Sequence, residues 1–111
     1  MGFLGKLFGK KEEEKATKAG KVNVAAAATS AGIPAEKVGL DGQFDESGLA
    51  KRVAKALDDA NISDSVGLWV AQTGSTVVLK YNPDAESVLA KAKQVAQGVD
   101  GATAVTAQPN S

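Results

Sequence analysis

The chain of 111 residues contains no cysteine and no histidine. Without cysteine it has no disulfide scaffold, no thiolate metal site and no cysteine nucleophile. Without histidine it lacks the usual general base, the common serine-hydrolase triad and most zinc chemistry. The carboxylates that remain show neither the spacing of an EF-hand loop nor the contrasting environments of a catalytic pair. We therefore expect a protein that is not an enzyme and has no resident cofactor.

Long apolar runs are missing as well. No stretch approaches the roughly 18–20 apolar residues of a membrane span. Residues 22–31 are the most signal-like segment, but a mostly polar stretch precedes them and alanine is only weakly apolar. The sequence thus predicts a cytoplasmic protein, with peripheral contact at the inner membrane left open.

Charge of either sign is balanced overall, with 13 Lys plus Arg against 13 Asp plus Glu. Its distribution is uneven, because residues 1–21 hold six Lys and three Glu, a net of +3. The remainder holds seven basic and ten acidic residues, a net of −3. An acidic body without clustered Lys and Arg predicts no nucleic-acid binding, since phosphate contacts need such clusters.

Residues 1–20 predict a basic amphipathic helix. On a helical wheel the large apolar side chains fall within roughly 140° of each other. These candidate contact residues and the lysines beside them are Phe3, Leu4, Leu7 and Phe8 with Lys6, Lys10 and Lys11. The stripe has three interpretations: it lies in a bilayer interface while the lysines meet anionic headgroups, it docks on the domain and completes its core, or the segment is disordered.

Residues 21–43 are difficult to interpret from the sequence. Gly32, Pro34, Gly39 and Gly42 interrupt this part of the chain, as is typical of a connector. We expect either a linker or an extension that packs on the following domain, which spans residues 44–108.

That domain opens with a helix. Asp45 is a good N-cap, with Phe44 and Leu49 placed as a hydrophobic staple across it. Apolar residues then recur at helical spacing up to Ala60, whereas Arg52 and its basic and acidic neighbours are expected to face solvent. An asparagine at position 61 suits the left-handed residue that ends a helix.

Two β-prone runs, 66–72 and 75–81, predict a hairpin with Thr73 and Gly74 as its turn. This turn places Val70 opposite Val77 on an apolar face that the helices cover. Trp69, the only tryptophan, then lies on the other face. There it is either an exposed contact residue or is covered by part of residues 1–43.

The last part of the domain predicts a helix and a strand. Asn82-Pro83 and the acidic residue after them start a helix whose apolar stripe runs to Ala96 and which ends at Gly98. A strand is expected over 102–107, followed by the tail 109–111. The fold class is therefore α+β, in the order α-β-β-α-β, with two helices on one face of a three-stranded mixed sheet and an amphipathic helix at the N-terminus.

This order, with its Leu49–Leu57 helix, its Val66-x-Leu68-x-Val70 strand and its Gly98-Val99 helix end, resembles the BON domain family. The likeness covers roughly residues 45–108 and is strongest to the bacterial cytosolic potassium-binding proteins that join a BON domain to a LysM domain. We expect no LysM segment, so glycan binding is not part of what the resemblance implies. It implies a non-enzymatic module that binds phospholipid surfaces, small ligands or cations.

Combining these features, we expect a BON-like binding module that the N-terminal segment brings to an anionic phospholipid surface or to a protein partner. The alternative is a soluble sensor of potassium or another small ligand. Backbone carbonyls of the loops 61–65 and 98–101 would serve a weakly hydrated cation, but no side chain identifies a metal ligand.

Overall fold

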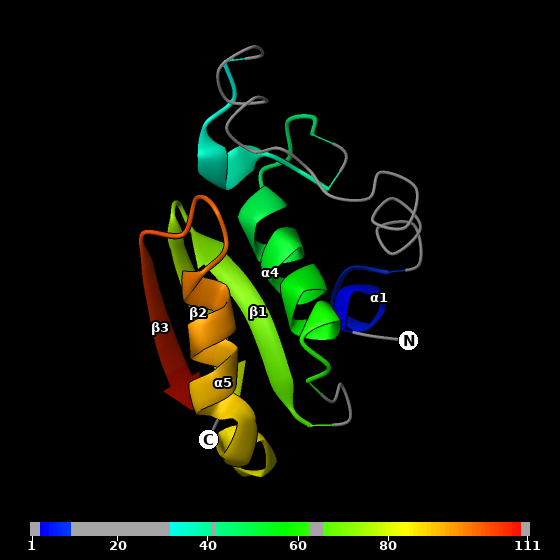
Figure 1. Ribbon diagram of the computed structural model, residues 1–111, viewed down its shortest axis with the longest axis vertical. Helices are drawn as coiled ribbons and strands as arrows, with labels where there is room; N and C mark the ends of the chain where they lie inside the picture. The colour runs from blue at the N-terminus through cyan, green and yellow to red at the C-terminus, as the bar shows by residue number, and fades with distance from the viewer. Residues whose placement is uncertain (1–2, 10–31, 41, 63–65, 110–111) are drawn as a thin grey trace.

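The computed structural model describes residues 3–9, 32–40, 42–62 and 66–109. The chain folds as an α+β domain in which helices pack on one face of a three-stranded mixed sheet, as predicted (Figure 1). The described elements, in chain order, are α1 (Phe3–Phe8), the 3-10 turn η1 (Ala35–Lys37), α4 (Gly48–Asp59), β1 (Leu68–Thr73), β2 (Thr76–Tyr81), the 3-10 turn η2 (Pro83–Ala85), α5 (Glu86–Gln97) and β3 (Ala104–Pro109).

The sheet has the strand order β1-β2-β3. β1 and β2 form an antiparallel hairpin, and β3 returns parallel to β2 after the crossover through α5. A parallel connection needs such a crossover, and its helix covers the face of the sheet that it crosses. Accordingly, α5 contacts β2 and β3 while α4 contacts β1 (Figure 1).

The hairpin keeps the predicted faces but not the predicted register. Val70 lies opposite Leu79 rather than Val77, because Gly74 and Ser75 form the turn, one residue later than expected. Gly74 has a φ of +60°, and glycine at the first central position is the signature of a type II′ turn. The offset moves each residue by two along its partner strand, so the same side chains still face the helices.

The core lies between the helices and this apolar face. Leu49, Val53 and Leu57 from α4 are fully buried, as are Leu68 of β1 and Leu79 of β2. The same cluster includes three alanines at helical spacing, namely Ala85 of η2 and Ala92 and Ala96 of α5. All three are 0% exposed, so this side of η2 and α5 faces the core.

The start of α4 differs from the prediction. Ser47 rather than Asp45 is the N-cap residue, and Asp45 Oδ1 accepts a hydrogen bond from Ser47 N at 2.9 Å. The expected staple is absent because Phe44 is 58% exposed, with Lys37 Nζ 5.8 Å from the centre of its ring. The other end is as predicted, since Asn61 adopts a left-handed φ of 61°.

The C-terminal elements follow the prediction with small offsets. Asn82 caps η2, which has Pro83 as its first residue and leads into α5. α5 ends at Gln97, but Gly98 has a φ of −84° and is not a left-handed cap. β3 begins and ends two residues later than expected, at Ala104 and Pro109.

The part of the connector that is described packs on the domain. Val38 and Leu40 are buried, and Ile33 forms a small apolar cluster with Val38 and Ala35. Of the two alternatives for residues 21–43, a packed extension therefore holds for the described residues from 32 onwards. Residues 21–31 lie outside the described part of the chain.

Candidate functional site

The N-terminal contact residues divide into a buried and a partly buried set. Phe3 and Leu4 are 0% and 2% exposed and belong to the main core. Leu7 and Phe8 pack against that core but keep part of their surface in solvent. α1 lies alongside α4, so the apolar stripe that the sequence predicts is used for docking at its first turn (Figure 1).

A carboxylate on α4 holds the start of α1. Asp58 accepts hydrogen bonds from the backbone N–H groups of Phe3 and Leu4, at 2.5 and 3.2 Å. These are among the N–H groups that a helix leaves without an intrahelical partner. The side chain of Asp58 thus fastens α1 to α4 through main-chain atoms.

The far end of α1 comes earlier than predicted. Gly9 has a φ of +96°, and its N–H bonds to the carbonyl of Gly5 at 3.0 Å. This positive φ ends the helix after Phe8, so a single helix over residues 1–20 is wrong. Lys6 belongs to α1, whereas Lys10 and Lys11 lie outside the described residues.

We call Leu7, Phe8 and the ammonium group of Lys51 the α1 tip. Lys51 Nζ lies 5.8 Å from the centre of the Phe8 ring and 2.7 Å from Asp45 Oδ2. Asp45 thus neutralises the ammonium of Lys51, whose side chain is only 15% exposed, so the α1 tip offers mainly apolar surface. The chain enters its most lysine-rich stretch directly after Gly9.

Trp69 does not join the α1 tip in one site. It lies on the face of the sheet opposite the helices, is 38% exposed and stands across from Lys80 rather than Val78. The expected face is confirmed, but the sheet separates this side chain from Phe3 and Leu4.

A buried arginine is the main polar feature that the sequence did not reveal. Arg52, expected to face solvent, is 8% exposed. Its guanidinium donates to the backbone carbonyls of Val38 at 2.7 Å and of Ala35 and Asp100 at 2.5 Å. Burial lowers the pKa of Arg52, and the nearby Asp100 opposes that shift. One side chain thus ties α4 to η1 and to the loop before β3.

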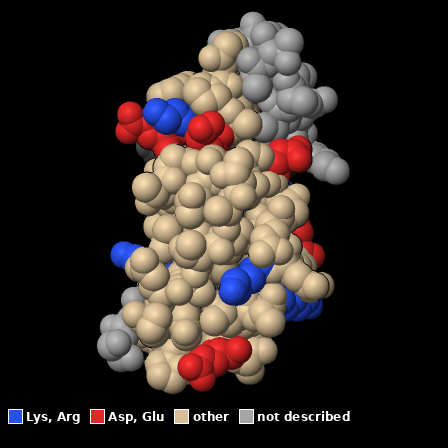
Figure 2. All heavy atoms as spheres, turned by 90° about the vertical axis from the view of Figure 1, so that its left-hand side faces the viewer, with Lys and Arg blue, Asp and Glu red and all other residues tan. Residues whose placement is uncertain are grey.

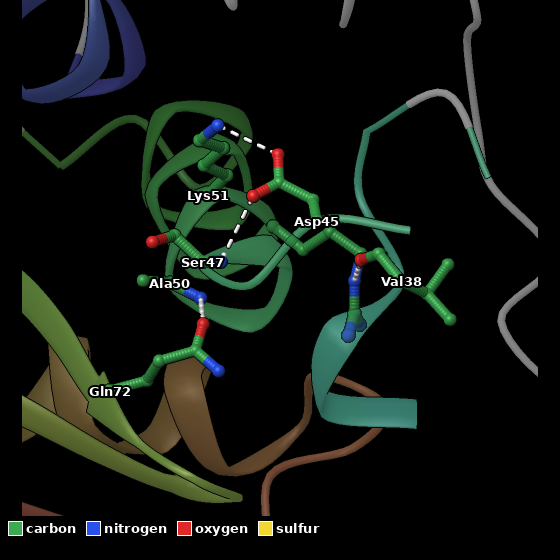
Figure 3. Close-up of polar contacts among 7 residues, drawn as sticks. Val38, Asp45, Ser47, Ala50, Lys51 and Gln72 are labelled. Carbon is green, nitrogen blue, oxygen red and sulfur yellow. Dashed lines mark hydrogen bonds and ion pairs between the residues drawn. The ribbon is translucent and has the colours of Figure 1, made fainter. Parts of the chain in front are cut away.

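Gln72 of β1 makes a second set of bridges. Its Oε1 accepts from the N–H of Ala50 in the first turn of α4 at 2.7 Å (Figure 3). Its Nε2 donates to the carbonyl of Glu36 at 2.9 Å. Figure 3 also shows Asp45 between Ser47 and Lys51. Each of these polar groups has a partner within the protein, as is usual for buried and partly buried polar groups.

The structure bears on the alternative function, cation binding, at one of the two candidate loops. Within the residues that are described, no three His, Cys, Asp or Glu side chains gather as metal ligands. In the loop 98–101, the carbonyl of Asp100 already accepts a hydrogen bond from Arg52. The loop 61–65 is described only for Asn61 and Ile62.

In the described part of the chain, none of the helices has the length and hydropathy needed to cross a bilayer. Comparison with family models, with curated proteins and with solved structures finds no match to this chain.

Proposed function

We propose that this protein is a non-enzymatic, BON-like binding module that associates peripherally with anionic phospholipid surfaces. The observation that carries the proposal is that Leu7 and Phe8 of the α1 tip remain partly exposed directly before the lysine-rich stretch of the sequence that begins at Lys10. Apolar side chains of this kind partition into the headgroup boundary, and neighbouring lysines add electrostatic attraction.

The buried half of α1 gives this contact a rigid base. Phe3 and Leu4 are held in the core and by Asp58, so the membrane would meet the α1 tip rather than a free helix. The net charge of +3 over residues 1–21 orients this end of the protein toward anionic lipid, while the net charge of −3 on the rest is repelled. Binding of this kind is weak and reversible.

Cosedimentation with vesicles tests the proposal. We expect the protein to pellet with vesicles of phosphatidylglycerol and phosphatidylcholine at low salt, to pellet less as salt rises, and to stay in solution with phosphatidylcholine alone. Replacing both Leu7 and Phe8 by serine is expected to reduce the bound fraction several-fold.

A matched pair of charge variants separates local from overall attraction. K10Q/K11Q removes the two charges that follow α1 in the sequence, whereas K80Q/K91Q removes two exposed charges from β2 and α5. We expect the first variant to lose binding and the second to retain most of it. Equal losses, or no pelleting of the unchanged protein at low salt, would contradict the proposal.

Thermal unfolding at equal concentrations of potassium chloride and sodium chloride tests the alternative function, potassium binding. A ligand that binds only the folded state raises the melting temperature. A rise with potassium alone, in a protein that does not bind vesicles, would replace lipid binding by cation binding as the function.

A further inference from the structure

We infer that the free edge of β3 pairs antiparallel with β3 of a second copy, joining two three-stranded sheets into one continuous sheet. β3 is the last strand in the order β1-β2-β3, and no described segment pairs with its outer side. An edge strand offers a row of main-chain donors and acceptors to any chain that matches it.

This edge has few of the features that usually prevent such pairing. None of the residues Ala104–Pro109 carries a charge, and the strand pairs residue by residue with β2, without a bulge. Charged side chains, proline, bulges and very short strands are the usual protection of natural edges, and of these β3 has only a proline, at its last residue. Figure 2, which faces the β3 side of the molecule, shows a broad surface of mostly uncharged residues there.

The register identifies which main-chain groups face outward. Asn82 N donates to the carbonyl of Gly67, so the even-numbered residues of β2 turn toward β1 and the odd-numbered ones toward β3. Leu79 is the register partner of Ala107, so its main-chain groups bond to Thr106 and Gln108, the residues on either side of Ala107. It follows that Val105, Ala107 and Pro109 direct their main-chain groups away from β2.

If a two-fold axis passes beside Thr106, the outward main-chain groups of one copy face the same groups of the second copy. Val105 of each copy would exchange both main-chain hydrogen bonds with Ala107 of the other copy, and the Thr106 residues would face each other. Pro109, which has no N–H, lies beyond these pairs and does not interrupt them. An uncharged strand is self-complementary in this way, whereas a charged one would oppose like charges at the axis.

Such an interface is small compared with the roughly 1,600 Å² of a standard protein complex, so we expect a weak dimer. Sedimentation equilibrium of the full chain from about 1 µM to about 1 mM should show the mass rising from one chain toward two. A single-chain mass over this whole range would overturn the inference.

Two variants locate the interface. T106K places two ammonium groups at the axis and should raise the dimer dissociation constant by about tenfold or more. Its control, Q108K, adds the same charge to the same face of the strand but away from the axis, and should leave the constant nearly unchanged.

A107P removes an outward N–H and should also weaken the dimer by about tenfold or more. Circular dichroism checks that A107P is folded. If A107P is not folded, the dimer dissociation constant of T106K alone decides whether the copies pair through β3. Dimerisation of T106K as tight as that of the unchanged protein would overturn the inference, because the contact would then lie elsewhere. Vesicle binding is measured separately and does not depend on this result.

Discussion

Arg52 shows how much of this small domain depends on one side chain. A buried cation is costly unless its donors are satisfied, and here backbone carbonyls rather than a carboxylate accept from it. These carbonyls belong to η1 and its neighbour Val38, and to the loop before β3, so the guanidinium fixes segments that are 14 to 48 residues away in the sequence.

Replacing Arg52 by methionine should therefore destabilise the protein strongly. The stem of the side chain is kept, but one buried carbonyl and two partly buried ones lose their donor, and we expect a loss of about 2–4 kcal/mol in the free energy of unfolding. Urea unfolding followed by circular dichroism measures it. K55M is the control on the same helix, where the exposed pair with Asp59 should account for at most about 0.5 kcal/mol. Equal effects of the two variants would contradict this assignment.

At the scale of elements, the start of α4 lies so close to the connector that position 48 has no room for a side chain. A Cβ added at Gly48 would lie 2.4 Å from the carbonyl oxygen of Val38, which is main chain and has little room to move. Helix propensity alone predicts that G48A stabilises α4 by about 1 kcal/mol. We expect the opposite sign, a loss of about 2 kcal/mol or more, in the same urea measurement. If G48A were more stable than the unchanged protein, the main chain around Val38 would have moved to make room for the added methyl group.

The attachment of α1 to α4 gives a second prediction at this scale. D58A removes the acceptor of two backbone N–H groups of α1 and should cost about 1–2 kcal/mol, with faster amide exchange in residues 3–8. D59A is the matched control, because Asp59 is exposed and pairs only with Lys55 among the described contacts.

The same variant distinguishes two forms of membrane contact. If the docked α1 tip meets the lipid, D58A should bind vesicles no better than the unchanged protein. Stronger binding would show that release of the whole stripe, including Phe3 and Leu4, is what drives association.

Sequence periodicity predicts these elements and their faces, but not their exact pairing. Leu68, Val70 and Leu79 alternate in a way that fixes which face is apolar, and that face is confirmed. Alternation does not distinguish the two turns, since both keep odd and even residues on the same sides. Arg52 could not be recognised because the carbonyls that it binds belong to segments far along the chain.

At the scale of the whole molecule, the core is small and α1 forms part of it. A domain of about sixty residues buries only about 60% of the surface of its unfolded chain, so its stability is marginal. Phe3 and Leu4 extend the core beyond the residues 44–108 that the sequence delimits, as does Leu40, whereas Val38 belongs to the separate small cluster with Ile33. The N-terminal segment is therefore a structural element as well as the proposed contact.

Two phenylalanines test this conclusion. F3A removes a ring that is 0% exposed and should cost about 3–5 kcal/mol, a large part of the total for a domain of this size. F44A removes a ring that is 58% exposed and should cost at most about 0.5 kcal/mol. Urea midpoints compare the two, since both substitutions delete the same group. If F3A unfolded at nearly the same midpoint as F44A, α1 would contribute little to the core, and the rigid base assumed for the α1 tip would be lost with it.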